Sequence, residues 1–351
     1  MMRESRSDRS KMLCGFVMLL LFASSICAAQ IASEYARGLA AFRAKDYAAA
    51  ADFFARADTA APGATDALIY QAKSLIHLQN FASSESALRK YIELHAESDE
   101  ALFLLGFVLN RENRPKESLE IYTRAAALKT PTGDDLKIVG LDYVLLNEYA
   151  DAITWLEKSV ELDPKNKEAW YYLGRAYFTR SLLSESRRAF LTVLNLDPHD
   201  AKAENNLGLI LESEAKPNEA LEAYRKAIEW QGGSAKQSEQ PYLNVGSLLL
   251  GLDRTGEAIA PLEKAVELGA NNANCHLKLG TAYLRTNRLP EARRELEKAE
   301  QLEPENAAIH YQLAKLYKQT HQMDKAKAEF QRTDELQSRA AKSRPSDPPE
   351  P

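Results

Sequence analysis

The chain has 351 residues, of which 45% are apolar, 8% aromatic and 27% charged, and its formal net charge is −5. This length allows two ordinary domains or one extended array, and the apolar and aromatic content excludes a chain that is disordered throughout. Acidic and basic residues alternate along predicted helical faces, which is typical of a solvated surface, so we expect no nucleic-acid partner.

Residues 1–29 differ in character from the rest of the chain. A basic stretch ending at Lys11 precedes a nearly continuous apolar run over residues 12–26, and small residues follow up to Ala29. This order is typical of a secretory signal peptide. The run is about fifteen residues long, whereas a transmembrane helix needs roughly twenty. We therefore predict cleavage after Ala29 and a periplasmic or secreted protein. The alternative is a membrane anchor formed by the uncleaved segment, which would be the chain's only membrane contact.

A 34-residue repeat begins at residue 31 and is shifted once, by four residues at 235–238. Its eighth place is always small: Gly38, Ala72, Gly106, Gly140, Gly174, Gly208, Gly246, Gly280 and Ala314. So is its twentieth place: Ala50, Ser84, Ser118, Ala152, Ser186, Ala220, Ala258, Ala292 and Ala326. Its twenty-fourth place is large and apolar: Phe54, Leu88, Tyr122, Leu156, Phe190, Tyr224, Leu262, Leu296 and Phe330. The pattern predicts two antiparallel helices per repeat, in close contact at the small residues, with the bulky residue filling the gap towards the neighbouring repeat.

The repeat over residues 167–200 shows the pattern most fully. It carries Trp170, Leu173, Gly174, Tyr177, Ser186, Phe190 and Pro198. With these residues in place, the chain resembles the tetratricopeptide repeat family. The resemblance extends over about nine repeats from Ile31 to Ala340. It implies an all-α fold, a right-handed α-solenoid of helix-turn-helix repeats stabilised by packing between neighbours.

Composition suggests how the array is divided. We predict six repeats over residues 31–234, an insertion or hinge at 235–238, and three repeats over 239–340. The insertion lies in the one long polar turn inside the array. The proline-rich end, residues 341–351, is predicted to be disordered.

No catalytic motif of useful specificity occurs in the chain. It lacks a phosphate-binding loop, a nucleophile elbow and a His-Glu-x-x-His zinc helix. Acidic residues fall mainly on faces opposite the apolar stripes, where solvated charge is the usual role. We therefore predict a protein that is not an enzyme and has no cofactor.

One place of the repeat carries side chains that could bind a metal ion. His276 and His310 occupy the same place in adjacent repeats, and Cys275 lies beside the first of them. Such side chains can bind a soft metal ion. The same place holds Trp170 and Tyr242 in other repeats, which favours packing, so no metal site is predicted.

The resemblance implies that the first helix of each repeat lines a concave groove through its fifth, ninth and twelfth places. The aromatic and arginine residues there are Tyr35, Phe42, Phe103, Phe107, Tyr171, Arg175, Phe178 and Tyr311. Such side chains suit the capture of a peptide or helix, although several could instead pack between helices. Binding is favoured for Tyr171, Arg175 and Phe178.

Two other kinds of binding groove occur in the family, an asparagine ladder and a clamp for chaperone tails. Asn206 and Asn244 fit a ladder of asparagines that holds a peptide backbone. Lys137 is followed by Leu141 where a clamp for chaperone tails would need asparagine, so we expect no such clamp.

Taken together, the sequence predicts an exported, non-catalytic scaffold that binds peptide or protein partners. The alternative is a regulatory or substrate-recruiting subunit of an envelope export or glycan-processing enzyme. Shape of this kind is shared by many binders, so the partner's identity does not follow from the sequence.

Overall fold

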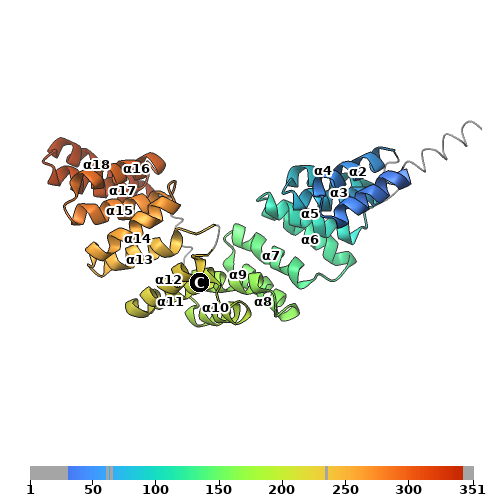
Figure 1. Ribbon diagram of the computed structural model, residues 1–351, viewed down its shortest axis with the longest axis horizontal. Helices are drawn as coiled ribbons and strands as arrows, with labels where there is room; N and C mark the ends of the chain where they lie inside the picture. Colours follow the sequence, from blue (N-terminus) through green and yellow to red (C-terminus); the bar gives the residue numbers. More distant parts are fainter. Residues whose placement is uncertain (1–30, 61–62, 64–65, 234–235, 343–351) are drawn as a thin grey trace, which may run out of the picture. The chain divides into compact units, whose positions relative to one another are not determined.

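The computed structural model describes residues 31–60, 63, 66–233 and 236–342, and within these ranges every regular element is an α-helix (Figure 1). The predicted signal peptide lies outside the described residues, as do residues 343–351 of the predicted tail. None of the described helices combines the length and the apolar character needed to cross a membrane.

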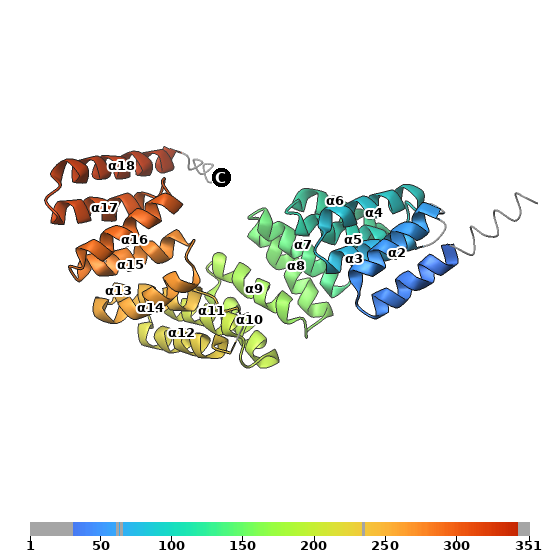
Figure 2. The ribbon, with the colours of Figure 1, turned by 45° about the horizontal axis from the view of Figure 1, so that its top comes forward.

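The chain forms two compact units that meet in the sequence between Leu182 and Leu183. The first contains a helix over residues 31–43, α2 (Tyr47–Ala60), α3 (Ala67–His77), α4 (Phe81–Leu94), α5 (Asp99–Arg111), α6 (Pro115–Leu128), α7 (Gly133–Leu145), α8 (Tyr149–Leu162) and α9 (Lys167–Thr179). The second contains α10 (Leu183–Leu196), α11 (Ala201–Ser213), α12 (Pro217–Gln231), α13 (Gln240–Gly251), α14 (Thr255–Leu268), α15 (Ala273–Arg285), α16 (Leu289–Leu302), α17 (Ala307–Gln319) and α18 (Met323–Lys342). Within each unit, consecutive helices pack as antiparallel pairs, as α15 to α18 show in Figure 2.

The small eighth place faces the bulky twenty-fourth place of the same pair. A Cβ atom on Gly106 would lie 2.6 Å from Cε2 of Tyr122, and one on Gly140 would lie 2.7 Å from Cγ of Leu156. The bulky residue also reaches the next pair, because Leu156 shares an apolar cluster with Leu173 of α9. The predicted reason for the repeat, close contact between paired helices, is confirmed.

Serine at the twentieth place adds a hydrogen bond to this contact. The hydroxyl of Ser84 donates to the carbonyl of Ala72 at 3.1 Å, and that of Ser118 donates to the carbonyl of Gly106 at 2.8 Å. Each bond joins the second helix of a pair to the first at the eighth place. The serines are fully buried, so each hydroxyl needs a hydrogen-bond acceptor inside the protein. The backbone carbonyl of the paired first helix provides that acceptor.

The long polar turn after α12 is closed by one side chain. The Gln231 carboxamide donates to the carbonyl of Ser238 at 3.0 Å and accepts from its backbone N–H at 2.9 Å. The apolar core of the second unit continues across this turn, from Tyr224 on α12 to Leu243 on α13. Residues 234 and 235 lie outside the described residues, and a hinge at 235–238 stays a prediction.

The turn between the two helices of each pair uses a left-handed backbone. Its φ lies between 56° and 62° in every repeat, at Lys45, Gln79, Asn113, Asn147, Ser181, Ala215, Asp253, Asn287 and His321. Asparagine and aspartate tolerate this conformation, whereas for other L-residues it costs roughly 1–2 kcal/mol. No glycine occupies the position, so part of this cost is retained in the native state.

Ala215→Gly is expected to raise the free energy of unfolding by about 0.5 kcal/mol, since relief of left-handed strain exceeds the added entropy of glycine in the unfolded chain. Ala215 is exposed and loses no packing. Asn147→Gly is the matched control and should change little. Urea unfolding followed by circular dichroism measures both, and a lower midpoint for Ala215→Gly would contradict this interpretation of the turn.

Candidate protein-binding surface

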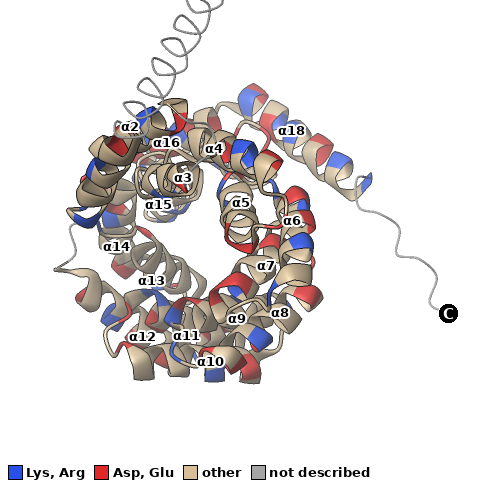
Figure 3. Cartoon of the chain, turned by 90° about the vertical axis from the view of Figure 1, so that its right-hand side faces the viewer, with Lys and Arg blue, Asp and Glu red and all other residues tan. Residues whose placement is uncertain are grey.

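The first helices of successive pairs lie side by side within each unit. α3 contacts α5, α5 contacts α7, and α7 contacts α9, while in the second unit α13 contacts α15 and α15 contacts α17. In Figure 3, α5 and α7 lie on the inner side of the first unit, and α6 and α8 lie on its outer side. The first helices α3 to α9 thus form a continuous surface in the first unit, and α13 to α17 form one in the second. The predicted groove residues lie on these first helices and on those that precede them in each unit.

The aromatic residues nearest the start of the array pack against one another. The ring of Tyr35 lies 5.6 Å from that of Phe54 and 6.2 Å from that of Tyr70, and Phe42 lies 5.8 Å from Tyr70, each edge-to-face. Both predicted residues are half-buried. Their rings join the helix over residues 31–43 to α2 and α3, so packing accounts for much of their surface.

Phe103 and Phe107 on α5 are also half-buried. Both pack against the apolar clusters of the preceding and the following pairs, and the ring of Phe103 lies 5.9 Å from that of Tyr122. Both rings therefore fill the interface between neighbouring helix pairs, and part of each ring stays exposed.

The predicted cluster on α9 has a different character. Tyr171, Arg175 and Phe178 follow an i, i+4, i+7 spacing, which places them on one helical face. The two aromatic residues are half-buried and Arg175 is exposed. The structure therefore brings these three predicted residues together on α9, at the end of the first unit.

The neighbouring helix α7 contributes residues that sequence reasoning missed. Leu141 and Val144 occupy the places of Arg175 and Phe178 one repeat earlier, and both are half-buried. In the sequence, Leu141 stands out only as the residue that replaces the asparagine of a chaperone-tail clamp. Both could have been found from their place in the repeat, which is 34 residues before Arg175 and Phe178. Equivalent residues of α7 and α9 lie side by side because the two helices are in contact.

An ion-paired lysine borders this pair of helices. Lys137 on α7 donates to Glu168 on α9 at 2.9 Å and to Asp134 at 3.0 Å. Burial acts to lower the pKa of Lys137, but the bonds to Glu168 and Asp134 outweigh it, and the net shift is upward. We call Lys137, Leu141 and Val144 of α7, with Tyr171, Arg175 and Phe178 of α9, the α7–α9 surface.

In the second unit, Asn244 and Asn206, the two asparagines of the predicted ladder, each have hydrogen-bond partners within the protein. The amide of Asn244 donates to Oδ1 of Asn205 at 2.9 Å, and its own Oδ1 accepts from Gln240 at 2.8 Å. The amide of Asn206 donates to the backbone carbonyl of Lys202 at 2.7 Å. The amide of Asn244 is thus bonded within the protein, and a role of the two residues in holding a peptide stays a prediction.

Tyr311 on α17 is the most open of the predicted aromatic residues, with 45% of its surface exposed. Its ring lies 6.0 Å from that of Phe330, and the Lys315 ammonium lies 5.7 Å from the ring centroid. It belongs to the second unit.

The residues weighed as a soft-metal site have separate partners. His276 and His310 each bond a glutamate on the following helix, Glu295 and Glu329 respectively. Cys275 is fully buried, which raises the pKa of its thiol to about 11. A neutral, buried thiol is a poor metal ligand, so this cysteine serves packing in the core of the second unit.

These features define a class of protein, an α-solenoid of helix pairs whose first helices present a continuous surface for interaction. Models of the tetratricopeptide repeat match residues 32–65, 71–131, 201–233 and 289–341, and a model described as a TPR repeat matches residues 140–181. The chain therefore belongs to the tetratricopeptide repeat proteins.

Relatives of known description match part of the chain. BBSome complex member BBS4 of Bos taurus is 25% identical over 161 residues, which are 44% of this chain and 31% of that protein. Anaphase-promoting complex subunit 3 of Schizosaccharomyces pombe is 20% identical over 242 residues, 68% of this chain and 35% of that protein. The chain thus spans about a third of the length of these relatives.

Among solved structures, the APC/C hetero-tetramer Cut9-Hcn1 is similar in fold, with a TM-score of 0.59 and 15% sequence identity. The match covers 80% of this chain and 54% of that one. At this identity the likeness shows the fold alone, which is the tetratricopeptide-type solenoid predicted from the repeat.

Proposed function

We propose that this protein is an exported, non-catalytic scaffold that binds a protein partner on the α7–α9 surface. The observation that carries the proposal is the exposed Arg175 between half-buried Tyr171 and Phe178, beside apolar Leu141 and Val144. Aromatic and arginine side chains contribute most to binding energy at protein interfaces. Relatives named as members of protein complexes support the same class of function.

The surface favours one kind of ligand. Most of its side chains are apolar, and Arg175 places a positive charge among them. Lys137 at the edge is already paired with Glu168 and Asp134. A guanidinium binds a carboxylate through two parallel hydrogen bonds, and an apolar stripe accepts the apolar face of a helix or extended peptide. The expected partner segment is therefore amphipathic, with an acidic residue among apolar ones.

Export is the second part of the proposal and rests on the order of residues 1–29. The expected result is a chain in the extracytoplasmic fraction whose N-terminal sequence begins at residue 30. Edman sequencing of the native protein and cell fractionation measure this. A full-length chain in the cytoplasm would refute export and leave partner binding to be judged on its own test.

Binding is tested with the mature chain and Tyr171→Ala combined with Phe178→Ala. Affinity capture from the native envelope identifies the partner, and fluorescence anisotropy with the partner's segment measures affinity. Loss of two aromatic anchors is expected to weaken binding at least about tenfold. Tyr311→Ala, an aromatic truncation in the second unit, is the control and should bind like the parent.

Equal affinity of the parent and the double variant would exclude the α7–α9 surface. A partner that is itself an enzyme, captured in a stable stoichiometric complex, would favour the alternative of a regulatory or substrate-recruiting subunit. Circular dichroism of both variants shows whether any loss of binding reflects unfolding instead.

A further inference from the structure

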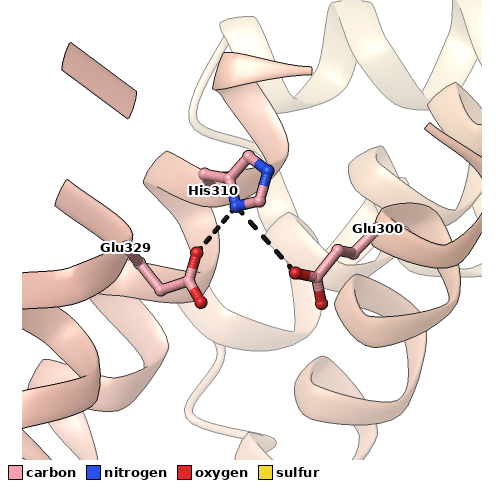
Figure 4. Close-up of side chains that lie close together, drawn as sticks. All are labelled: Glu300, His310 and Glu329. Carbon is pink, nitrogen blue, oxygen red and sulfur yellow. Dashed lines mark hydrogen bonds and ion pairs between the residues drawn. The ribbon is translucent and has the colours of Figure 1, made fainter. Parts of the chain in front are cut away.

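Three ligand-type side chains from three successive helices meet near the end of the array (Figure 4). Nδ1 of His310 on α17 lies 2.7 Å from a carboxylate oxygen of Glu329 on α18 and 4.0 Å from one of Glu300 on α16. One atom of each residue lies within 4.8 Å of the other two. Figure 4 shows the imidazole between the two carboxylates, which both approach the same ring nitrogen.

The other ring nitrogen of His310, Nε2, already has a hydrogen-bond partner. Nε2 of His310 lies 2.8 Å from the carbonyl oxygen of Pro304. A carbonyl only accepts, so Nε2 carries a hydrogen. Nδ1 then either carries the second hydrogen of an imidazolium, which the carboxylates accept, or presents its lone pair to a cation. A histidine that donates one N–H to a backbone carbonyl, with its free nitrogen facing carboxylates, is oriented as metal-binding histidines are.

The charges at this point are not balanced by protein groups. The ion-pair partner of both Glu300 and Glu329, among the described residues, is His310. A proton on His310 would cancel one of the two negative charges, whereas a divalent ion cancels both.

The preceding repeat provides a natural comparison. His276 and Glu295 form the same pair at 2.8 Å, and Nε2 of His276 lies 3.0 Å from a backbone carbonyl. The place of Glu300 is taken by Val266, and Arg294 bonds the second oxygen of Glu295 at 2.8 Å. The last repeat has alanine at the place of Arg294. The last repeat therefore has a second carboxylate and no arginine, whereas the preceding repeat has one carboxylate and an arginine.

We propose that Glu300, His310 and Glu329 bind a divalent transition-metal ion of the zinc type, which links α16, α17 and α18. One imidazole nitrogen and two carboxylate oxygens suit such an ion. Three protein ligands leave a fourth position for water or for an acidic group of a partner. Ligand atoms around a tetrahedral zinc ion lie roughly 3.3 Å apart, so small side-chain shifts of Glu300 and Glu329 complete the site.

The test is isothermal titration of Zn²⁺ into the tag-free mature chain after treatment with a chelator. The parent should bind one equivalent, and Glu300→Gln should weaken binding at least about tenfold. Glu297→Gln, on the same helix and outside the cluster, is the matched control and should bind like the parent. Zinc should also raise the melting temperature of the parent and of Glu297→Gln, and raise that of Glu300→Gln less.

A gain of binding makes the test stricter. Val266→Glu combined with Arg294→Ala gives the His276 pair the features of the last repeat and should add a second zinc equivalent. A parent that binds no zinc at 100 micromolar, or a Glu300→Gln variant with unchanged affinity, overturns the proposal. An unchanged stoichiometry in the double variant would refute the stated reason for the difference between the two repeats.

Discussion

Gly208→Ala is expected to lower the free energy of unfolding by about 2 kcal/mol, in the range of overpacked cores. The new Cβ would lie 2.4 Å from Cε1 and 2.5 Å from Cδ1 of Tyr224. The ring has no easy way to move, because Tyr224 is fully buried and its hydroxyl donates to Glu212 at 2.8 Å. α11 and α12 must therefore separate.

Gly251→Ala is the matched control, because no atom lies within 4 Å of the Cβ it would add. Its stability should stay the same or rise by up to about 1 kcal/mol, since alanine restricts the unfolded chain. Urea unfolding followed by circular dichroism measures both variants. If Gly208→Ala unfolded at the parent's midpoint, the contact between eighth and twenty-fourth places would not limit the residue at that place.

Asp142→Asn is expected to raise stability at pH 7.5 by about 2 kcal/mol, although it removes a hydrogen-bonded carboxylate. Asp142 is fully buried between α5, α6 and α7, and burial raises its pKa to about 6 despite bonds from Ser118 and Asn110. Ionisation at neutral pH therefore costs free energy in the native state. A shift of about two units corresponds to nearly 3 kcal/mol as an upper limit.

Asparagine can satisfy the same partners without a charge. Its carbonyl would accept from Asn110, as Asp142 now does at 2.8 Å. Its NH2 would donate to the Ser118 hydroxyl, whose single hydrogen is then free to bond the carbonyl of Gly106. Asp142→Ala is the contrasting variant, because it leaves buried polar groups unpaired and should cost about 1–3 kcal/mol.

The pH dependence gives the decisive measurement. The folded pKa of Asp142 lies above its unfolded value, so the native state holds the proton more tightly. Its contribution is most favourable below about pH 4 and is lost as the pH rises through about 6. The stability difference between Asp142→Asn and the parent should therefore shrink between pH 7.5 and pH 4. A constant difference would show that the charge is not what destabilises the parent.

The predicted groove shows how far reasoning from places in a repeat extends. Tyr35 and Phe103 hold equivalent inward places, and so does Tyr171. Yet Tyr35 packs among aromatic rings, while Phe103 fills the interface between two neighbouring helix pairs. The place predicts which side of the helix a residue faces. Its exposure depends on the side chains of neighbouring helices, which differ from repeat to repeat.

The polar residues make the same point. Asn244 bonds Asn205, one position from the asparagine predicted as its neighbour in the ladder. A shift of one residue turns a side chain by about 100° around a helix. Which asparagine of α11 faces Asn244 therefore depends on how α11 and α13 pack, and the sequence does not give that packing.

The sequence alone determined the fold of this protein, because the contact that sets the repeat lies within one helix pair. Residues sixteen positions apart, such as Gly208 and Tyr224, must meet wherever the array continues, and this leaves a regular signal. The tertiary structure decided which surface stays open and where charges gather. Glu300 meets His310 and Glu329 only because three helices from two repeats converge, and no periodic pattern encodes a contact that occurs once.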